Sequence, residues 1–328
     1  MKMQLNEATD LSVRFLQRLE LSEVESKYIT ENLVEAELAG RKTHGFIRLL
    51  SFKKTFDSQK LITGELPLKV ISETSNSIHI DGQFKLGYGP IYQSLEMAIP
   101  KAKQSKLFSV GIKDLGVTGY IGAYAKKATE QDLIFIGFNN SAGGLVPYGS
   151  ISAMWGTNPI TVGIPTNNYP VILDMASSQI TWGDLLVAKN SGKEIKSGTA
   201  IDGEGRITTD PSKAMEGGLL PFFGHKGSGL AFIVELLGGA LTGSRVGNNV
   251  AGGWGSFYIL IDPTLFRPIQ DFKDNIQTAI DELKNSPKMA GFDEIYFPGE
   301  QSAKLSEEQR KSNTVEIDDG LLEKIKNI

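Results

Sequence analysis

The two ends of the chain carry apolar residues at helical spacing. Leu11, Phe15 and Leu19 predict an amphipathic helix over 5–20. Ser22 and Glu25 match the capping-box pattern that opens a second helix, and Gly40 is placed to end it in a left-handed conformation. The buried stripe of this second helix is predicted to comprise Val24, Tyr28, Leu33 and Ala36. Surface helices are expected near the other end of the chain, over 271–283 and 320–328.

The middle of the chain alternates between short apolar runs and helical patterns. Strands are predicted at 69–73, 77–80, 107–112, 133–138, 160–164, 171–175 and 257–261, and helices at 91–103, 120–130 and 227–241. Pro100 is expected to kink or stop the first of these helices. Strand–helix–strand order around 107–138 favours a parallel pairing, whereas Pro165 to Asn168 is typical of a hairpin turn. The pattern therefore predicts an α/β fold with a mixed sheet.

Composition narrows the class of protein. The chain has 328 residues, enough for about two domains, and it is 40% hydrophobic and 22% charged. A formal net charge of −4 without a long basic run argues against nucleic acid or an anionic membrane as the main partner. No cysteine and only three histidines leave no thiolate site and little for a metal cage, so no metal is expected. Neither a signal peptide nor a membrane-spanning run is evident, and the protein is expected to be soluble and cytoplasmic.

The stretch from Gly40 to Leu49 combines one of the three histidines with arginines on either side. If its backbone is helical, His44 and Arg48 share a face at i and i+4. An arginine fork grips a carboxylate, and a neighbouring histidine can move a proton at the adjacent carbon-bound oxygen. The plain alternative is a helix end with solvated cations.

Several turns rich in glycine are joined to polar groups, although no complete G-x-G-x-x-G occurs. Gly116 to Tyr120 and Asn139 to Gly144 each follow a predicted strand. Asp174 ends another strand, where an acid could bind a ribose hydroxyl or cap a helix. Lys226 stands at the amino end of an apolar helix, where a cation opposes the helix dipole unless an anion lies between them.

In their order along the chain these motifs resemble the type-2 malate/L-lactate dehydrogenase family. The pattern S-H-G-x-x-R is met by Thr43 to Arg48, D-G-x-x-x-x-G by Asp81 to Gly87, and L-G-T-N-P by Trp155 to Pro159. Four further matches are L-D-M-A-x-S at Leu173 to Ser178, D-x-x-G-x-x-T-x-D-P at Asp202 to Pro211, K-G-x-G-L-A at Lys226 to Ala231, and P-G-E at Pro298 to Glu300. The ordered set is specific although each motif alone is weak.

The resemblance implies a dehydrogenase that uses NAD or NADP, with a non-Rossmann fold and a homodimeric state. It makes His44 the proton donor and acceptor, and it assigns Thr43, Arg48 and Asn140 to the substrate, a small carboxylate. It implies that the cofactor is lined by Leu173, Asp174, Met175, Ala176, Ser177, Ser178, His225, Lys226, Gly299 and Glu300. Residues 1–75 with 268–328 would form a helical domain, and 76–267 the domain that binds cofactor and substrate.

Asp114 stands where many members of this family have a histidine, some with a catalytic role. We predict that Asp114 is catalytic and hydrogen-bonds His44; alternatively, it meets a cationic group on the substrate. Three functions therefore remain open. They are a dehydrogenase of 2-hydroxy acids, a reductase of a cyclic-imine carboxylate, and a protein that binds the cofactor without catalysis.

Overall fold

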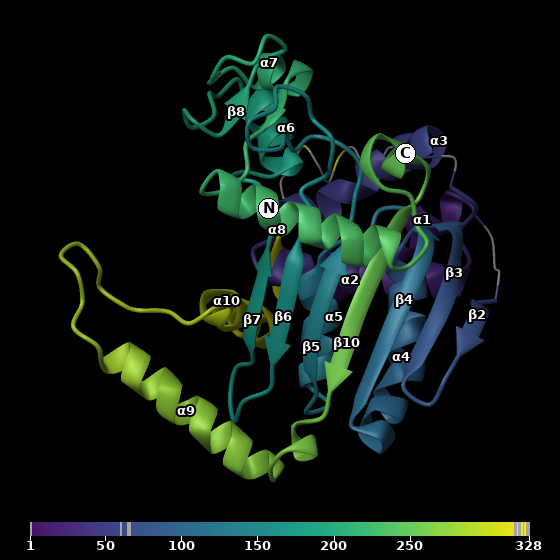
Figure 1. Cartoon of the computed structure of the whole chain (residues 1–328), viewed down its shortest axis with the longest axis vertical. Helices are drawn as coiled ribbons and strands as arrows, with labels where there is room; N and C mark the ends of the chain where they lie inside the picture. The colour runs from purple at the N-terminus through teal and green to yellow at the C-terminus, as the bar shows by residue number, and fades with distance from the viewer. Residues whose placement is uncertain are drawn as a thin grey trace.

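A mixed sheet of seven strands is the frame of the protein in the computed structural model, which describes residues 2–59, 61–63 and 67–317 together with Gly320, Glu323 and Ile325. The strands lie in the order β2-β3-β4-β10-β5-β6-β7 (Figure 1). Their bounds are β2 (Lys69–Glu73), β3 (Ser77–Lys85), β4 (Leu107–Leu115), β5 (Ile134–Asn139), β6 (Ile160–Ile164), β7 (Val171–Met175) and β10 (Trp254–Ile261). The predicted α/β class and mixed sheet are confirmed.

Only one of the six strand pairings in this sheet is parallel, that of β3 with β4. The predicted parallel pairing of β4 with β5 is wrong, because β10 lies between them and pairs antiparallel with both. A local strand–helix–strand pattern cannot reveal a strand inserted from more than 100 residues later. The predicted hairpin is confirmed, since β6 and β7 pair antiparallel around the turn at 165–168.

Helices cover one face of the sheet. The helices are α1 (Leu5–Arg18), α2 (Glu23–Leu38), α3 (Leu49–Gln59), α4 (Tyr88–Ser105), α5 (Ile121–Thr129), α6 (Trp182–Asn190), α7 (Pro211–Glu216), α8 (His225–Val234), α9 (Ile269–Asn285) and α10 (Glu300–Ser312). The main core lies between the sheet and helices α4 and α5, where Tyr92, Tyr124 and Tyr258 are buried (Figure 1). The alternate side chains of β5 and β10 point to the opposite face.

The two ends of the chain meet. A two-stranded sheet pairs β1 (Lys2–Gln4) with β11 (Thr314–Glu316). A second core joins helices α1, α2 and α3 to Val315, Ile317 and Ile325. Ile280, the buried residue of α9, is not part of this core, and α9 extends away from the terminal helices (Figure 1). The predicted helix over 320–328 lies largely outside the described residues.

A small lobe over 176–224, which the sequence pattern did not predict, stands above the carboxyl end of β7 (Figure 1). It contains α6, α7 and the short strands β8 (Ala200–Ile201) and β9 (Gly218–Leu219), and it has its own core around Leu185 and Leu219. After it, α8 continues into a π-helical segment, η3 (Glu235–Ala240). The lobe holds part of the candidate site, as described below.

Local details differ from the prediction where tertiary contacts intervene. Gly40 is left-handed (φ 74°), as predicted. Val24, by contrast, is 44% exposed, so the predicted buried stripe is wrong at this position. Helix α4 runs through Pro100 to Ser105, so Pro100 does not stop it. Within the described residues, no helix combines the length and apolar character that crossing a bilayer requires.

Candidate active site

The stretch around His44 forms two 3-10 turns, η1 (Lys42–His44) and η2 (Phe46–Arg48), joined at Gly45. The condition of a helical backbone, on which a shared face of His44 and Arg48 depended, is therefore not met. The buried carboxylate of Glu37 fixes the bend, accepting a hydrogen bond from Phe46 N (3.1 Å) and pairing with Lys42 Nζ (2.7 Å). A Cβ on Gly45 would lie 1.9 Å from Glu37 Oε2, so a larger residue there would have to displace the Glu37 carboxylate. Glu37 is a site residue that the sequence analysis missed.

His44 is held as a neutral imidazole. Its Nδ1 lies 3.1 Å from Thr43 Oγ1. Burial lowers the pKa of His44 to about 4, and the charges of Arg48 and Arg41 act in the same direction while the Asp184 carboxylate opposes them. At neutral pH the ring is thus able to accept a proton. Arg48 is near enough to act on the pKa of His44, although the two residues do not share an α-helical face.

Asp184 is the acid that approaches His44, and the sequence analysis did not single it out. It lies in the first turn of α6, where it forms a capping box with Thr181. Helix α6 packs directly on the turn that carries His44, since a Cβ built on Gly183 would lie 2.9 Å from Thr43 Cβ. The pattern Thr-x-x-Asp at 181–184 could have indicated the helix start. It could not have indicated a contact with a residue about 140 positions earlier.

Arg48 and Tyr88 carry buried polar atoms that have no hydrogen-bond partner among the described residues. These atoms are Arg48 Nε and the Tyr88 hydroxyl. Burial raises the pKa of Tyr88 to about 12, and the charge of Arg48 opposes the rise, so the two groups are near one another. Buried donors are almost always satisfied in proteins. An unmatched guanidinium N–H beside a neutral imidazole is therefore a natural site for a carboxylate ligand.

The structure does not form the predicted hydrogen bond between Asp114 and His44. Asp114 pairs with Lys113 Nζ (2.7 Å), and its backbone N donates to Ser244 Oγ (3.1 Å). It has a left-handed backbone (φ 54°), which turns its side chain toward Lys113 and Gly253. The acid that influences His44 is Asp184, not Asp114.

Asn140 is fully buried, and both ends of its amide are engaged. Its Nδ2 donates to Arg245 O (2.9 Å), and its Oδ1 accepts from Gly255 N (2.6 Å). The expected direct contact of Asn140 with substrate is therefore not supported. Its hydrogen bonds connect the turn after β5 to the start of β10.

Strand β7 brings together the three segments predicted to bind the cofactor. The segment Leu173 to Ser178 begins in β7, and Ile172 N donates to Pro298 O (2.9 Å), which fixes the turn at Gly299. Phe222 N donates to Ser177 O (3.1 Å), which places the amino end of α8, with His225 and Lys226, beyond the carboxyl end of the strand, whereas the Gly299 turn lies beside its amino end. His225 and Lys226 are exposed there. Segments separated by more than 120 residues thus converge on one edge strand.

A cavity of about 280 Å³ adjoins β7. It is lined by Tyr120, Ile172, Asp174 and Gly299 and by the charged residues Glu35, Arg41, Lys126, Glu307, Arg310 and Lys311, among others. A Cβ on Gly299 (φ 88°) would lie 3.0 Å from Ile172 N and O, so the turn needs glycine. The mixture of apolar wall, aromatic ring and cations is of the kind that holds part of a dinucleotide. This lining fits a nicotinamide cofactor.

Several predicted cofactor residues use their side chains to hold the protein together. Asp174 accepts from Thr161 Oγ1 and Gly122 N, both at 2.8 Å, and so anchors α5. Glu300 lies between Lys284 (2.5 Å) and Lys304 (2.9 Å). The hydroxyls of Ser177 and Ser178 donate to backbone carbonyls, Asn158 O and Ile180 O. In this segment a ligand would therefore meet mainly backbone atoms and the side chains of Leu173, Met175 and Ala176.

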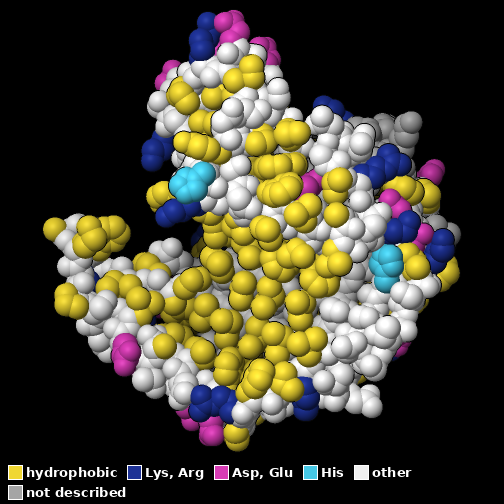
Figure 2. Space-filling view, viewed as in Figure 1, with side chains coloured by type: hydrophobic (Ala, Val, Ile, Leu, Met, Phe, Trp, Pro, Cys, Tyr) yellow, Lys and Arg dark blue, Asp and Glu magenta, His cyan; other side chains and the backbone are white. Residues whose placement is uncertain are grey.

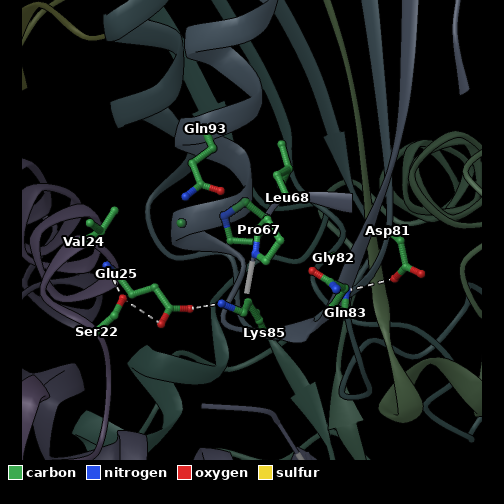
Figure 3. A pocket seen from close by; sticks show the side chains of 12 residues that line it. Ser22, Val24, Glu25, Pro67, Leu68, Asp81, Gly82, Gln83, Lys85 and Gln93 are labelled. Atoms are coloured by element: carbon green, nitrogen blue, oxygen red, sulfur yellow. Dashed lines mark hydrogen bonds and ion pairs between the residues drawn. The ribbon is translucent and has the colours of Figure 1, made fainter. Parts of the chain in front are cut away.

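A second cavity, of about 380 Å³, contains none of the predicted site residues (Figure 3). It lies where α2, β3 and α4 meet, and it contains the buried ion pair of Lys85 with Glu25 (2.6 Å). Among the residues that the structure describes, no three histidine, aspartate or glutamate side chains gather as metal ligands would.

Comparison with known proteins supports the family resemblance of the sequence motifs along nearly the whole chain. Residues 3–326 match the family model described as malate/L-lactate dehydrogenase. The malate/(S)-sulfolactate dehydrogenase of Methanothermus fervidus is 33% identical over 98% of this chain and 95% of its own length. The crystal structure of sulfolactate dehydrogenase from Methanocaldococcus jannaschii superposes with a TM-score of 0.89 at 31% identity, covering 100% of this chain and 96% of that one.

Two more distant relatives name their cofactors. The (2R)-3-sulfolactate dehydrogenase (NADP(+)) of Chromohalobacter salexigens is 32% identical over 74% of this chain and 73% of its own length. The ureidoglycolate dehydrogenase (NAD(+)) of Escherichia coli O157:H7 is 28% identical over 89% of this chain and 86% of its own. These matches support a nicotinamide cofactor of either kind. The chain belongs to the malate/L-lactate dehydrogenase family, and it is an oxidoreductase of 2-hydroxy acids that uses a nicotinamide cofactor.

Proposed function

We propose that the substrate is a small 2-oxo or 2-hydroxy carboxylate whose carboxylate binds Arg48 and whose oxygen faces His44. The observation that carries this proposal is the buried Arg48 Nε without a partner beside a neutral imidazole. A carboxylate would satisfy this donor and form the second bond of the guanidinium fork. The Tyr88 hydroxyl is a further donor within the same surroundings.

His44 handles the proton in this reaction. If Nδ1–H donates to Thr43 Oγ1, Nε2 carries the lone pair and can accept the proton of the 2-hydroxyl. The nicotinamide cofactor, when bound, accepts the hydride from C2, so that a 2-hydroxy acid becomes a 2-oxo acid and one proton is released. Asp184 would stabilise the imidazolium that forms, because its carboxylate favours the protonated ring.

The cofactor would lie along β7, with backbone groups of 173–178 and of the Gly299 turn around it and Lys226 on a phosphate. Lys226 supports this because it is exposed at the second position of α8, where a cation opposes the dipole. Direct titration with NADH and NADPH, followed by fluorescence, decides between the two dinucleotides. Lys226→Ala should weaken binding more than it slows hydride transfer.

A panel of substrates tests the reaction class. The purified protein is assayed with NADH and NADPH against 2-oxo acids, including sulfopyruvate and oxaloacetate, and against cyclic imines with a carboxylate. Turnover of at least one 2-oxo acid is expected. Turnover of imines alone would favour a reductase of cyclic-imine carboxylates, in which Asp114 would meet a cationic group on the substrate. In the structure Asp114 already pairs with a cation of the protein, Lys113, at 2.7 Å. Cofactor binding without any turnover would refute catalysis.

We also propose that the protein is a homodimer whose interface lies on the uncovered face of the sheet. Figure 2 shows a continuous apolar surface over this face. It includes half-buried side chains of β5 and β10, such as the stacked pair Phe138 and Phe257, and exposed Phe232 and Ile233 of α8. Apolar surfaces of this extent mark interfaces. Sedimentation should give twice the chain mass, and Phe257→Lys should give a folded monomer; a monomeric parent would refute the proposal.

A further inference from the structure

Arg41 stands between the reaction centre and the cavity at β7. It precedes η1, and its carbonyl accepts the hydrogen bond of His44 N (2.8 Å). Its own N donates to Ala36 O (2.7 Å), so its backbone is fixed at the end of α2. Its exposed side chain lines the cavity of about 280 Å³. The residue thus belongs both to the wall of the proposed cofactor site and to the turn that presents His44.

The other cations of this cavity are paired with acids. Lys126 pairs with Glu35 (2.9 Å), Arg310 with the same Glu35, and Lys311 with Glu307 (2.5 Å). Arg41 forms no ion pair with a carboxylate in the described part of the chain. The charged lining comprises four cationic and three acidic side chains. Of these four cations, Arg41 is the one without such an ion pair in the described part of the chain.

The Arg41 guanidinium acts on two other residues of the cavity lining, Tyr120 and Asp174. Burial and the Asp174 carboxylate raise the pKa of Tyr120 to about 12, and Arg41 opposes this rise by its charge and a hydrogen bond. Burial also raises the pKa of Asp174, against the hydrogen bonds of Thr161 and Gly122 and the charge of Arg41. Both effects place the guanidinium close to Tyr120 and Asp174, which line the same cavity.

We infer that Arg41 is a phosphate ligand of the nicotinamide dinucleotide, and the residue through which cofactor occupancy reaches the turn that carries His44. The inference rests on the proposed cofactor site at β7. Its chemistry is that of a guanidinium fork, which matches two phosphate oxygens. The phosphate is either the pyrophosphate that NAD and NADP share or the 2′-phosphate of NADP alone.

Such a contact changes the charge around His44. The groups that face His44 are the Thr43 hydroxyl of its own turn, Arg48 of η2, Asp184 of α6, and Arg41. Apart from burial, the charges of Arg48 and Arg41 keep its pKa low. A cofactor phosphate would offset Arg41, and a substrate carboxylate would offset Arg48. His44 would therefore gain basicity as the two ligands bind, and would hold the transferred proton best in the complete complex.

The first experiment measures dinucleotide binding. Arg41→Gln should weaken the affinity by about 10- to 100-fold, the range of lost charge-assisted hydrogen bonds. Arg41→Lys, which keeps the charge without the fork, should lie between Arg41→Gln and the parent. Arg14→Gln is the matched control, because Arg14 is exposed on α1 and lines neither the cavity nor the turn. A loss with both NADH and NADPH identifies the pyrophosphate, and a loss with NADPH alone identifies the 2′-phosphate.

The second experiment follows the link to His44 by NMR of the histidine rings, of which there are three. Adding the dinucleotide should raise the pKa of His44 in the parent and in Arg14→Gln, but not in Arg41→Gln at saturating ligand. His79, bound to Thr242 O (2.8 Å) and outside the site, serves as reference. Thermal midpoints of the variants matching the parent would show that they are folded.

Two results would overturn the inference. Unchanged dissociation constants for Arg41→Gln with both dinucleotides would exclude the phosphate contact. An equal rise of the His44 pKa in the parent and in the Gln variant would exclude the link. These failures differ from a failure of the proposed function, because in that case the parent itself would bind neither dinucleotide.

Discussion

The ion pair of Lys85 with Glu25 offers a direct test of how the helical part is joined to the sheet. The two side chains are only 7% and 10% exposed, and Lys85 Nζ lies 2.6 Å from Glu25 Oε1 (Figure 3). Lys85 ends β3, and Glu25 lies in the first turn of α2, the helix that leads to Arg41 and His44. We predict that Lys85→Met destabilises the fold strongly.

The magnitude follows from the geometry. At 2.6 Å the attraction is roughly 6 kcal/mol for an effective dielectric of about 20. Much of this attraction only offsets the desolvation of the two charges, so the net contribution of the pair to the free energy of unfolding is smaller. Removing one partner leaves the other charge buried, which typically costs about 3–5 kcal/mol. Among the described residues, the Glu25 carboxylate then keeps the bond from Ser22 Oγ (3.2 Å), which does not neutralise its charge.

The matched variant is Lys85→Met combined with Glu25→Gln, which removes both charges and leaves an amide that can still accept from Ser22. Urea unfolding followed by far-ultraviolet circular dichroism gives the free energy of unfolding of each protein. The double variant should recover most of the stability lost in the single one. Equal losses in the two variants would refute the reasoning, because the cost would then come from packing and not from an uncompensated charge.

Three further predictions concern the reaction. His44→Ala should lower turnover by about 10²–10⁴-fold, the usual contribution of a positioned proton acceptor, with unchanged dinucleotide affinity; near-normal turnover would place the role elsewhere. Arg48→Lys keeps the charge but loses the fork, so KM for the acid should rise clearly; a parent-like KM would exclude the clamp. In the oxidative direction kcat/KM should fall as pH drops through the His44 pKa of about 4, because only the neutral ring accepts a proton, and Asp184→Asn should move this limb to lower pH; a shift to higher pH would contradict the role of Asp184.

Features that depend on neighbouring residues could be predicted from the sequence. The β6–β7 hairpin follows from turn residues at 165–168, and the left-handed Gly40 from its place after a helical pattern. The segments proposed to bind the cofactor could be singled out only through the resemblance, because each turn alone suits an ordinary connection. Once the family is known, its fold implies that these segments meet at one strand, and no further pattern in the sequence is needed to predict it.

Features that depend on distant partners could not be predicted. Asp114 and Asp184 are both acids near a turn or helix start, and nothing local says which of them approaches His44. The left-handed backbone of Asp114 turns one away, and the packing of Gly183 on Thr43 brings the other in. Likewise, His44 and Arg48 have helical spacing, but the backbone N–H of Phe46 donates to the Glu37 carboxylate and not to a carbonyl of a continuous helix.

The edge position of β7 has a consequence for the lifetime of the protein. In the seven-stranded sheet β7 pairs with β6 alone, and the segments proposed to bind the dinucleotide are all attached to it. A strand with one neighbour has fewer contacts to hold it than an interior strand, and a ligand that binds only the closed form suppresses local opening in proportion to its saturation. Amide hydrogens of β7 and β6 would then exchange more slowly in a cell rich in nicotinamide dinucleotide. Proteolytic turnover of this enzyme would in the same way follow the size of the coenzyme pool.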